Sequence, residues 1–345
     1  MKKLIAIFAL VAGVAGGAFA QTIQPSNLTQ VEPGFKSFAN DLATSLPYAS
    51  QIGLDWSSAY IGQFPHFGVG LAGGVVTVPT KGIQEVANAL GVGGVLPSEL
   101  LTPNLGLPIP AAVVEARLGG LFLPFDVGVK FGTIPKSVNL STFLPSGTSI
   151  DFLLYGLEVR TPIVKEGLLI PQISVGAGFN HFSGDIRSTV GQAITVGNIS
   201  YAGQSNDLSF TAPTLDFNWN SNSLDAKIEV SKTVLFILTP YIGAGLAYGF
   251  SSAGGSVQST LEDNGSPITQ SQIDNIDAYY QSTGQTAPSL SPTQSFSTSS
   301  PANGFSFWAF GGTSVNLLIL KLDVSGMYNI LTQKLGVNVG ARIQF

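Results

Sequence analysis

Apolar and polar residues alternate along residues 335–345, the last stretch of the chain. An apolar residue at every second position places these side chains together on one face of a β-strand. The apolar positions are Leu335, Val337, Val339, Ala341, Ile343 and Phe345. Because the residues between them are small or polar, the pattern predicts a strand with one face against an apolar environment.

The same period of two recurs along most of the chain. It predicts strands over residues 66–76, 111–119, 123–132, 149–160, 168–181, 214–231, 237–250, 304–314, 317–329 and 335–345. In membrane barrels short turns at one end alternate with long loops at the other, so the strands between two long loops are even in number. We therefore expect about 10 strands, within a range of about 10–14.

Residues 233–250 are apolar and long enough to suggest a transmembrane helix. Pro240 interrupts this stretch, and Gly243, Gly245 and Gly249 recur in its second half. Proline removes a helical hydrogen bond, and the β-branched and aromatic residues around it favour strands. The stretch therefore predicts a turn followed by a strand.

Composition indicates what the apolar strand faces contact. A soluble β-sandwich also alternates, but its exterior needs charged residues, and only 10% of this chain is charged, against roughly a quarter in an ordinary soluble domain. Strands of about ten residues with a continuous apolar face predict an all-β fold, a transmembrane antiparallel β-barrel.

Such barrels gather aromatic residues at the membrane interfaces. We expect an outer belt of Phe131, Phe179, Trp219, Tyr248, Phe250 and Trp308.

The first 20 residues have the pattern of an export signal. Lys2 and Lys3 precede an apolar run over residues 4–14, and Ala18 and Ala20 mark a signal peptidase site. We expect cleavage near Ala20. Residues 21–52 then predict a short helical segment, either a lumen plug or a periplasmic segment, before a barrel over residues 53–345. One face of this helix holds Phe35, Phe38, Leu42, Leu46 and Ala49.

Long external loops are expected at residues 77–110, 133–148, 182–213 and 251–303. Residues 251–303 are rich in Ser, Thr, Gln and Gly and contain no Lys or Arg. This composition predicts a long, polar, solvated loop.

The final strand resembles the last strand of bacterial outer-membrane β-barrels, whose assembly machinery reads alternating apolar residues and a C-terminal Phe. The resemblance implies an assembly signal made by Val337, Val339, Ala341, Ile343 and Phe345, and residence in the outer membrane. The stretch from Leu46-Pro47-Tyr48 through Gly53 and Trp56 to residues 65–70 resembles the opening motif of a poorly characterised family of such barrels. More distantly, the chain resembles FadL-type channels in its size and in having a helical segment before the first strand.

Charge and composition exclude several function classes. A net charge of -5 and a pI near 5.0 offer no basic surface for nucleic acid. With no cysteine and two histidines, the chain predicts no metal site and no cofactor. His181, Ser183 and Asp185 lie close together in sequence, but triad members meet through the fold rather than by adjacency. We therefore expect no catalytic residue and no enzyme activity.

The inward strand positions carry six acidic and six basic residues. They are Glu115, Arg117, Asp126, Lys130, Glu158, Arg160, Asp225, Lys227, Glu229, Lys321, Asp323 and Arg342. A balanced set in a small barrel can pair and close the lumen. Other inward rows are small, for example Gly243, Gly245 and Gly249, and either leave room for solutes or relieve strand twist.

The sequence therefore favours a narrow or gated passive channel for small, in particular hydrophobic, solutes. The alternative is a structural or adhesive surface barrel with a closed lumen, and an outer-membrane hydrolase is a third hypothesis. The expected partners are outer-membrane lipid, the barrel-assembly machinery and a small hydrophobic solute.

Overall fold

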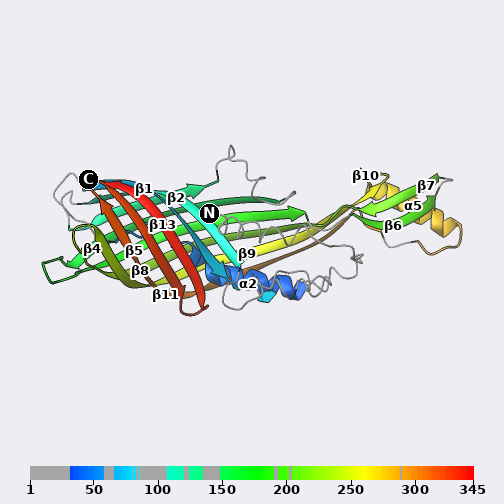
Figure 1. The fold of residues 1–345 in the computed structure, drawn as a ribbon. Helices are drawn as coiled ribbons and strands as arrows, with labels where there is room; N and C mark the ends of the chain where they lie inside the picture. Colours follow the sequence, from blue (N-terminus) through cyan, green and yellow to red (C-terminus); the bar gives the residue numbers. More distant parts are fainter. Residues whose placement is uncertain are drawn as a thin grey trace.

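Ten antiparallel strands form a closed barrel in a computed structural model of the chain (Figure 1). The structure describes residues 32–57, 66–79, 81–82, 85, 107–119, 124–134, 148–189, 193–201, 204–287 and 290–345. The strands are β1 (His66–Val78), β2 (Leu107–Gly119), β3 (Asp126–Thr133), β4 (Thr148–Val164), β5 (Gln172–Thr189), β8 (Thr214–Ser231), β9 (Leu238–Asp263), β11 (Thr293–Leu317), β12 (Leu320–Asn329) and β13 (Lys334–Gln344). The expected signal peptide, residues 1–20, lies outside the described residues.

Hydrogen bonding closes the barrel in two places where strands distant in sequence meet. β13 pairs with β1, from Gly68 opposite Gln344 to Val76 opposite Gly336. β9 pairs with β11 along most of both strands. Every other neighbour follows chain order, apart from the step from β5 to β8. The predicted all-β barrel of ten strands is confirmed.

Alternation sets which residues face the lumen. In β13, Val337, Val339 and Ile343 are exposed on the outside, while Asn338 and Arg342 between them are buried. Because successive side chains point to opposite sides of a strand, this pattern makes the barrel apolar outside and polar inside. It is the reverse of a soluble protein.

The stretch predicted as a long loop at 251–303 is mostly regular structure, which corrects that prediction. β9 and β11 continue far beyond the barrel and meet β6 (Ile194–Tyr201), β7 (Gln204–Phe210), the two-residue β10 (Ser266–Pro267) and α5 (Gln270–Ser282) (Figure 1). Leu208, Phe210, Leu261, Ile273 and Ile276 make a second hydrophobic core there. We call this part the distal tip.

Two predicted belt residues are placed wrongly by the sequence analysis. Phe131 and Phe250 lie on the outer surface as expected, but Trp219 and Trp308 are 5% and 2% exposed and face the lumen. A Cβ on Gly245 would overlap the Trp308 indole. The large rings therefore occupy the space that small residues of neighbouring strands leave inside the barrel.

The N-terminal segment lies inside the distal end of the barrel. Its helix α2 (Glu32–Ala49) contacts β8, β9 and β11, and Leu42, Leu46 and Ala49 are buried in the main hydrophobic core (Figure 1). Residues 50–57 continue through the lumen toward the end where β1 begins. Neither helix in the described part of the chain has the length and apolar content needed to cross a bilayer.

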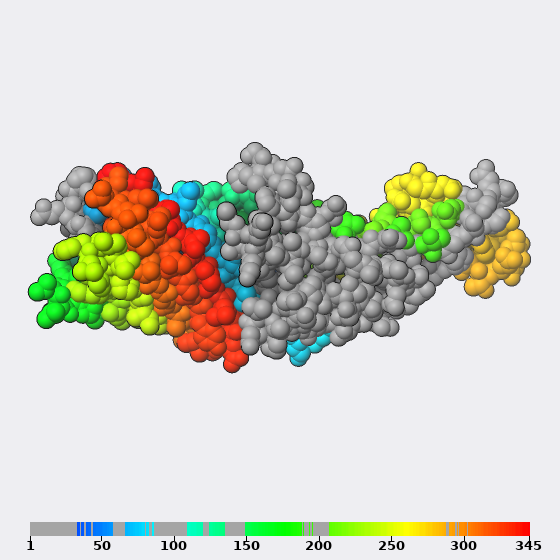
Figure 2. Space-filling view, in the orientation of Figure 1, coloured from blue at the N-terminus to red at the C-terminus, as the bar shows by residue number. Residues whose placement is uncertain are grey.

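Turns at the C-terminal end of the barrel carry large, exposed apolar side chains. Leu168, Phe236 and Leu318, in the turns before β5, β9 and β12, are 93%, 92% and 95% exposed. The turn at residues 168–171 replaces the start of the predicted strand 168–181. Phe236 and Leu318 have φ of 60° and 57°, a left-handed conformation that bulky residues rarely adopt. These turns project at the left of the space-filling view (Figure 2).

Candidate functional site

The twelve charged residues predicted to face the lumen all lie at inward positions of their strands. Nine of them are buried, and Lys227, Lys321 and Asp323 are half-buried. Charges at such depth need partners, since an unpaired buried charge is strongly destabilising. The partners come from the barrel wall and from the N-terminal segment.

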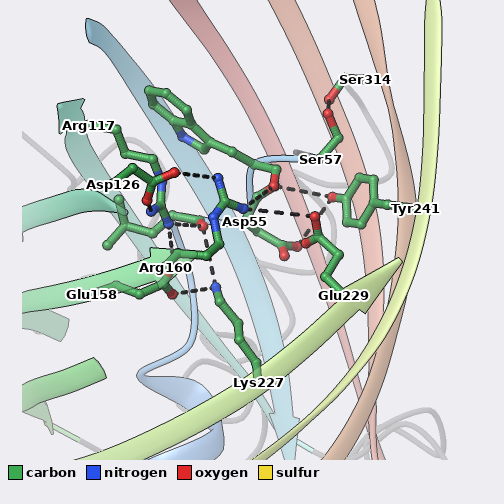
Figure 3. Close-up of polar contacts among 12 residues, drawn as sticks. Asp55, Ser57, Arg117, Asp126, Glu158, Arg160, Lys227, Glu229, Tyr241 and Ser314 are labelled. Atoms are coloured by element: carbon green, nitrogen blue, oxygen red, sulfur yellow. Dashed lines mark hydrogen bonds and ion pairs between the residues drawn. The ribbon is translucent and has the colours of Figure 1, made fainter. Parts of the chain in front are cut away.

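Ion pairs link β2, β3, β4 and β8 along one side of the lumen. Arg117 contacts Asp126 at 2.6 Å and also pairs with Glu158. Arg160 contacts Asp126 at 3.2 Å, and Lys227 contacts Glu158 at 2.5 Å (Figure 3). Each carboxylate therefore bridges two cations from different strands, and the cluster fixes the wall on one side of the barrel.

Three cations of the wall, Lys130, Arg117 and Arg160, also bind the backbone of residues 50–56. Lys130 Nζ donates to the carbonyl oxygens of Ser50 and Ile52 at 2.7 and 2.8 Å. Arg117 donates to the Leu54 carbonyl oxygen at 2.9 Å, and Arg160 donates to that of Trp56 at 2.7 Å. Every second carbonyl of the N-terminal segment, from residue 50 to residue 56, therefore accepts a hydrogen bond from a cation of the wall.

Glu115 holds the same segment from its donor side. Its carboxylate accepts the Leu54 N–H at 2.5 Å and the Trp56 indole N–H at 2.6 Å. The Trp56 ring lies under the Arg342 guanidinium, 4.6 Å from the ring centroid, which is cation–π geometry. Among the described residues no ion pair joins Glu115 to Arg117, so Glu115 serves the N-terminal segment rather than the wall cluster.

The other predicted charges have local partners. Asp225 accepts from the Asn180 amide at 2.7 Å, and Lys321 donates to the Asn316 amide oxygen at 2.9 Å. Asp323 pairs with Arg342. Glu229 is the exception: Arg160 lies 3.8 Å from one of its oxygens, and neither oxygen has a hydrogen-bond partner within the described part of the chain.

Small inward residues make room for the N-terminal segment. A Cβ on Gly249 would overlap the Pro47 ring, one on Gly68 would lie 2.7 Å from the Trp56 ring, and one on Gly128 would lie 3.0 Å from Leu54. The sequence predicted that the small inward residues either leave room for solutes or relieve strand twist. In the structure residues 47–56 occupy the space beside them.

Two small cavities lie beside this segment in the described part of the chain. Both flank Trp56, one lined by Asp55 and Glu115 among others, the other by His66 and Gln344 among others. Each leaves ≈ 10 Å³ for the centres of water molecules, room for about one water. We call residues 32–57 the plug.

Several plug contacts involve uncharged residues that the sequence analysis did not select. Ser50 and Ser57 contact Ser223 and Ser314, with oxygens 3.1 and 2.6 Å apart. Tyr241 donates to the Asp55 carbonyl oxygen at 3.2 Å (Figure 3). Inward serines on β8 and β11 were visible in the alternation, but nothing in the sequence identified their partners.

A separate polar cluster lies on the outer wall. His181 Nε2 is 3.1 Å from the Ser183 hydroxyl, and its Nδ1 is 2.9 Å from the Asn222 amide oxygen. The imidazole stacks on Tyr155 with centroids 4.7 Å apart. Sequence reasoning considered Asp185 as the third member, but the register places Asn222 opposite His181.

The outward positions of β13 hold the residues of the predicted assembly signal. Val337, Val339, Ala341 and Ile343 are exposed on the barrel exterior. Phe345 packs on Phe67 of β1 with ring centroids 5.1 Å apart, and its N–H donates to the Phe67 carbonyl oxygen at 2.9 Å.

A model of the Lsa36-like family matches residues 59–345. The chain belongs to this family. No curated protein matches this Lsa36-like chain. Among solved structures it is similar to the outer membrane protease OmpT from Escherichia coli, with 7% identity, a TM-score of 0.36, and coverage of 83% of this chain and 99% of that chain. It is also similar to the transport unit of the Escherichia coli autotransporter AIDA-I, with 11% identity, a TM-score of 0.32, and coverage of 93% of this chain and 99% of that chain. The Ralstonia pickettii toluene transporter TbuX is similar with 10% identity, a TM-score of 0.23, and coverage of 97% of this chain and 96% of that chain.

Proposed function

We propose that this Lsa36-like chain is an outer-membrane β-barrel whose own plug closes the lumen, and that it serves as a surface scaffold carrying the distal tip. Export would follow from cleavage near Ala20, and insertion from recognition of the β13 pattern by the barrel-assembly machinery. The single observation that carries the closed lumen is the binding of alternate plug carbonyls by Lys130, Arg117 and Arg160.

The exterior supports placement in a lipid bilayer. The strands expose Leu, Val, Ile and Phe on their outward faces, as membrane barrels do over an apolar band about 25 Å tall. From Leu318 in its turn to Tyr328 on β12, the chain rises roughly 26 Å along the barrel axis, at about 3.4 Å per residue and a tilt of about 40°. The apolar tips of the turns therefore lie at the periplasmic surface of the outer membrane.

The narrow or gated channel is the competing proposal, and it requires the plug to move. Six charge-assisted hydrogen bonds join plug residues to Lys130, Arg117, Arg160 and Glu115. At about 1.5 kcal/mol each, their loss costs about 9 kcal/mol, so the open fraction is on the order of 10⁻⁶. A passive solute pathway through this lumen is therefore disfavoured.

The distal tip supports a scaffold role. It has its own hydrophobic core, and β9 and β11 connect it to the barrel as long paired strands. An ordered projection of this kind positions its surface away from the membrane, toward the medium.

Conductance in planar bilayers tests the closed lumen. The purified full-length chain is expected to stay at the background level, and so is Lys321→Met, whose lysine contacts the wall residue Asn316. Lys130→Met removes a latch on the plug and is expected to show channel openings. A parent protein that conducts as often as Lys130→Met, or that takes small solutes into liposomes, would contradict the proposal.

A further inference from the structure

Three polar side chains on the outer wall have the arrangement of a nucleophile, a general base and a residue that orients the base. Ser183 and His181 stand two residues apart on β5, on the outward face, and Asn222 is paired with His181 on β8. All three are half-buried, so the group is accessible from outside the barrel. None of them contacts the plug.

The hydrogen bonds fix the protonation that catalysis needs. The Asn222 amide oxygen accepts only, so the His181 Nδ1 at 2.9 Å must carry a proton. In a neutral imidazole this leaves Nε2 as an acceptor for the Ser183 hydroxyl, 3.1 Å away. Stacking on Tyr155, with an interplanar angle of 20°, holds the ring plane. A serine with its base in hydrogen-bond reach and the base oriented by a third group is an activated nucleophile.

We propose that Ser183, His181 and Asn222 form an esterase site for carboxylic esters of acyl chains in the outer leaflet. The position on the wall indicates this substrate. Toward the membrane the same face continues with exposed Leu157 and Leu224, an apolar surface for an acyl chain. Toward the distal end it becomes polar: Arg187, whose side chain is 59% exposed, pairs there with Asp216 at 2.7 Å.

The reaction balances without any co-reactant besides water. The Ser183 oxygen attacks the ester carbonyl carbon while its proton passes to His181 Nε2, which gives a tetrahedral oxyanion. Asn220 stands opposite Ser183 on the same face, and its side-chain amide is a donor for that oxyanion. Collapse breaks the ester C–O bond, and the alcohol leaves with the proton from His181. Water then attacks the acyl-serine, His181 takes its proton and returns it to Ser183, and the carboxylic acid is released.

A fluorophosphonate probe tests the nucleophile on the refolded full-length chain. Mass spectrometry is expected to find the adduct on Ser183 in the parent, none there in Ser183→Ala, and a labelling rate lower by a factor on the order of 10³ or more in His181→Ala. His66→Ala and Ser299→Ala, distant from this cluster, are controls and should label like the parent. A folded parent without an adduct on Ser183, or equal labelling of Ser183 in His181→Ala, would overturn the site.

Two lipid substrates distinguish the source of the ester. Release of fatty acid is measured from vesicles of phosphatidylethanolamine and phosphatidylglycerol, and separately from lipopolysaccharide. Release from one substrate identifies the lipid class, and release from neither overturns the proposal. Asn222 acts through His181 as a positioning residue: Asn222→Leu should lose activity, while Asn222→Asp, which still accepts from Nδ1, should recover much of it. Because the cluster lies outside the lumen, these results are independent of whether the plug closes the barrel.

Discussion

Replacing Lys130 with methionine tests the hydrogen bonds that join the barrel wall to the plug. Met keeps a chain of similar length but removes the ammonium that donates to the Ser50 and Ile52 carbonyl oxygens. Two charge-assisted hydrogen bonds contribute about 3–6 kcal/mol. The variant no longer desolvates a buried ammonium, which offsets part of this loss. We therefore expect Lys130→Met to lower the free energy of unfolding by about 2–4 kcal/mol.

Urea unfolding in lipid vesicles, followed by tryptophan emission, measures this change. Trp56 lies in the plug and is 3% exposed, so iodide quenching of the folded variant reports separately whether the plug has loosened. Lys321→Met is the matched control, because the half-buried Lys321 donates to Asn316 of the wall and does not contact the plug within the described residues. We expect it to lower the free energy of unfolding by less than about 1 kcal/mol. Equal free energies of unfolding for the two variants would refute the role given to Lys130.

Three further predictions concern the wall, the plug space and assembly. Glu158→Gln should lower the free energy of unfolding by about 3–5 kcal/mol, since Lys227 and Arg117 each lose an ion pair. Glu229→Gln, whose oxygens have no hydrogen-bond partner in the described chain, should stay within about 1 kcal/mol of the parent; similar losses in both would contradict the assignment. Gly249→Val should displace Pro47 and cost about 1–3 kcal/mol in the same unfolding assay, whereas Gly326→Val, with open space outside, should be tolerated. Phe345→Asp should abolish heat-modifiable folded protein in the outer membrane, and a normal level would exclude the C-terminal assembly signal.

The barrel strands could be predicted because each has one face in an apolar environment. That constraint gives the sequence a period of two and fixes the register, so the inward charges from Glu115 to Arg342 can be placed from the sequence. The distal parts of β9 and β11 gave no such signal. One face of β9 is buried there, at Ala253, Val257 and Leu261 for example, but Ser and Gly fill most positions on both faces, so the hydropathy alternates too weakly to predict a strand.

The plug and the outer-wall cluster depended on information that a sequence does not carry. Lys130 and Arg117 bind backbone carbonyls, and a carbonyl is present at every residue, so no residue type marks the partner. Asn222 meets His181 only because β5 and β8 pair in one register across an intervening segment. Trp219 and Trp308 were assigned to the outer belt from their aromatic type and the strand directions, although they alternate in step with Ser221 and Ser306, which are buried inside the barrel.

A reversible lock on the plug tests the closed lumen most directly. The chain has no cysteine, and the Ser50 and Ser223 hydroxyl oxygens are 3.1 Å apart, so a disulfide between Ser50→Cys and Ser223→Cys would tie the plug to β8. Single-channel conductance is then recorded from the oxidised protein and again after reduction. The account predicts that the disulfide forms in the folded protein and that both states remain at background. Openings that appear on reduction and vanish on reoxidation would contradict it and identify a gated channel.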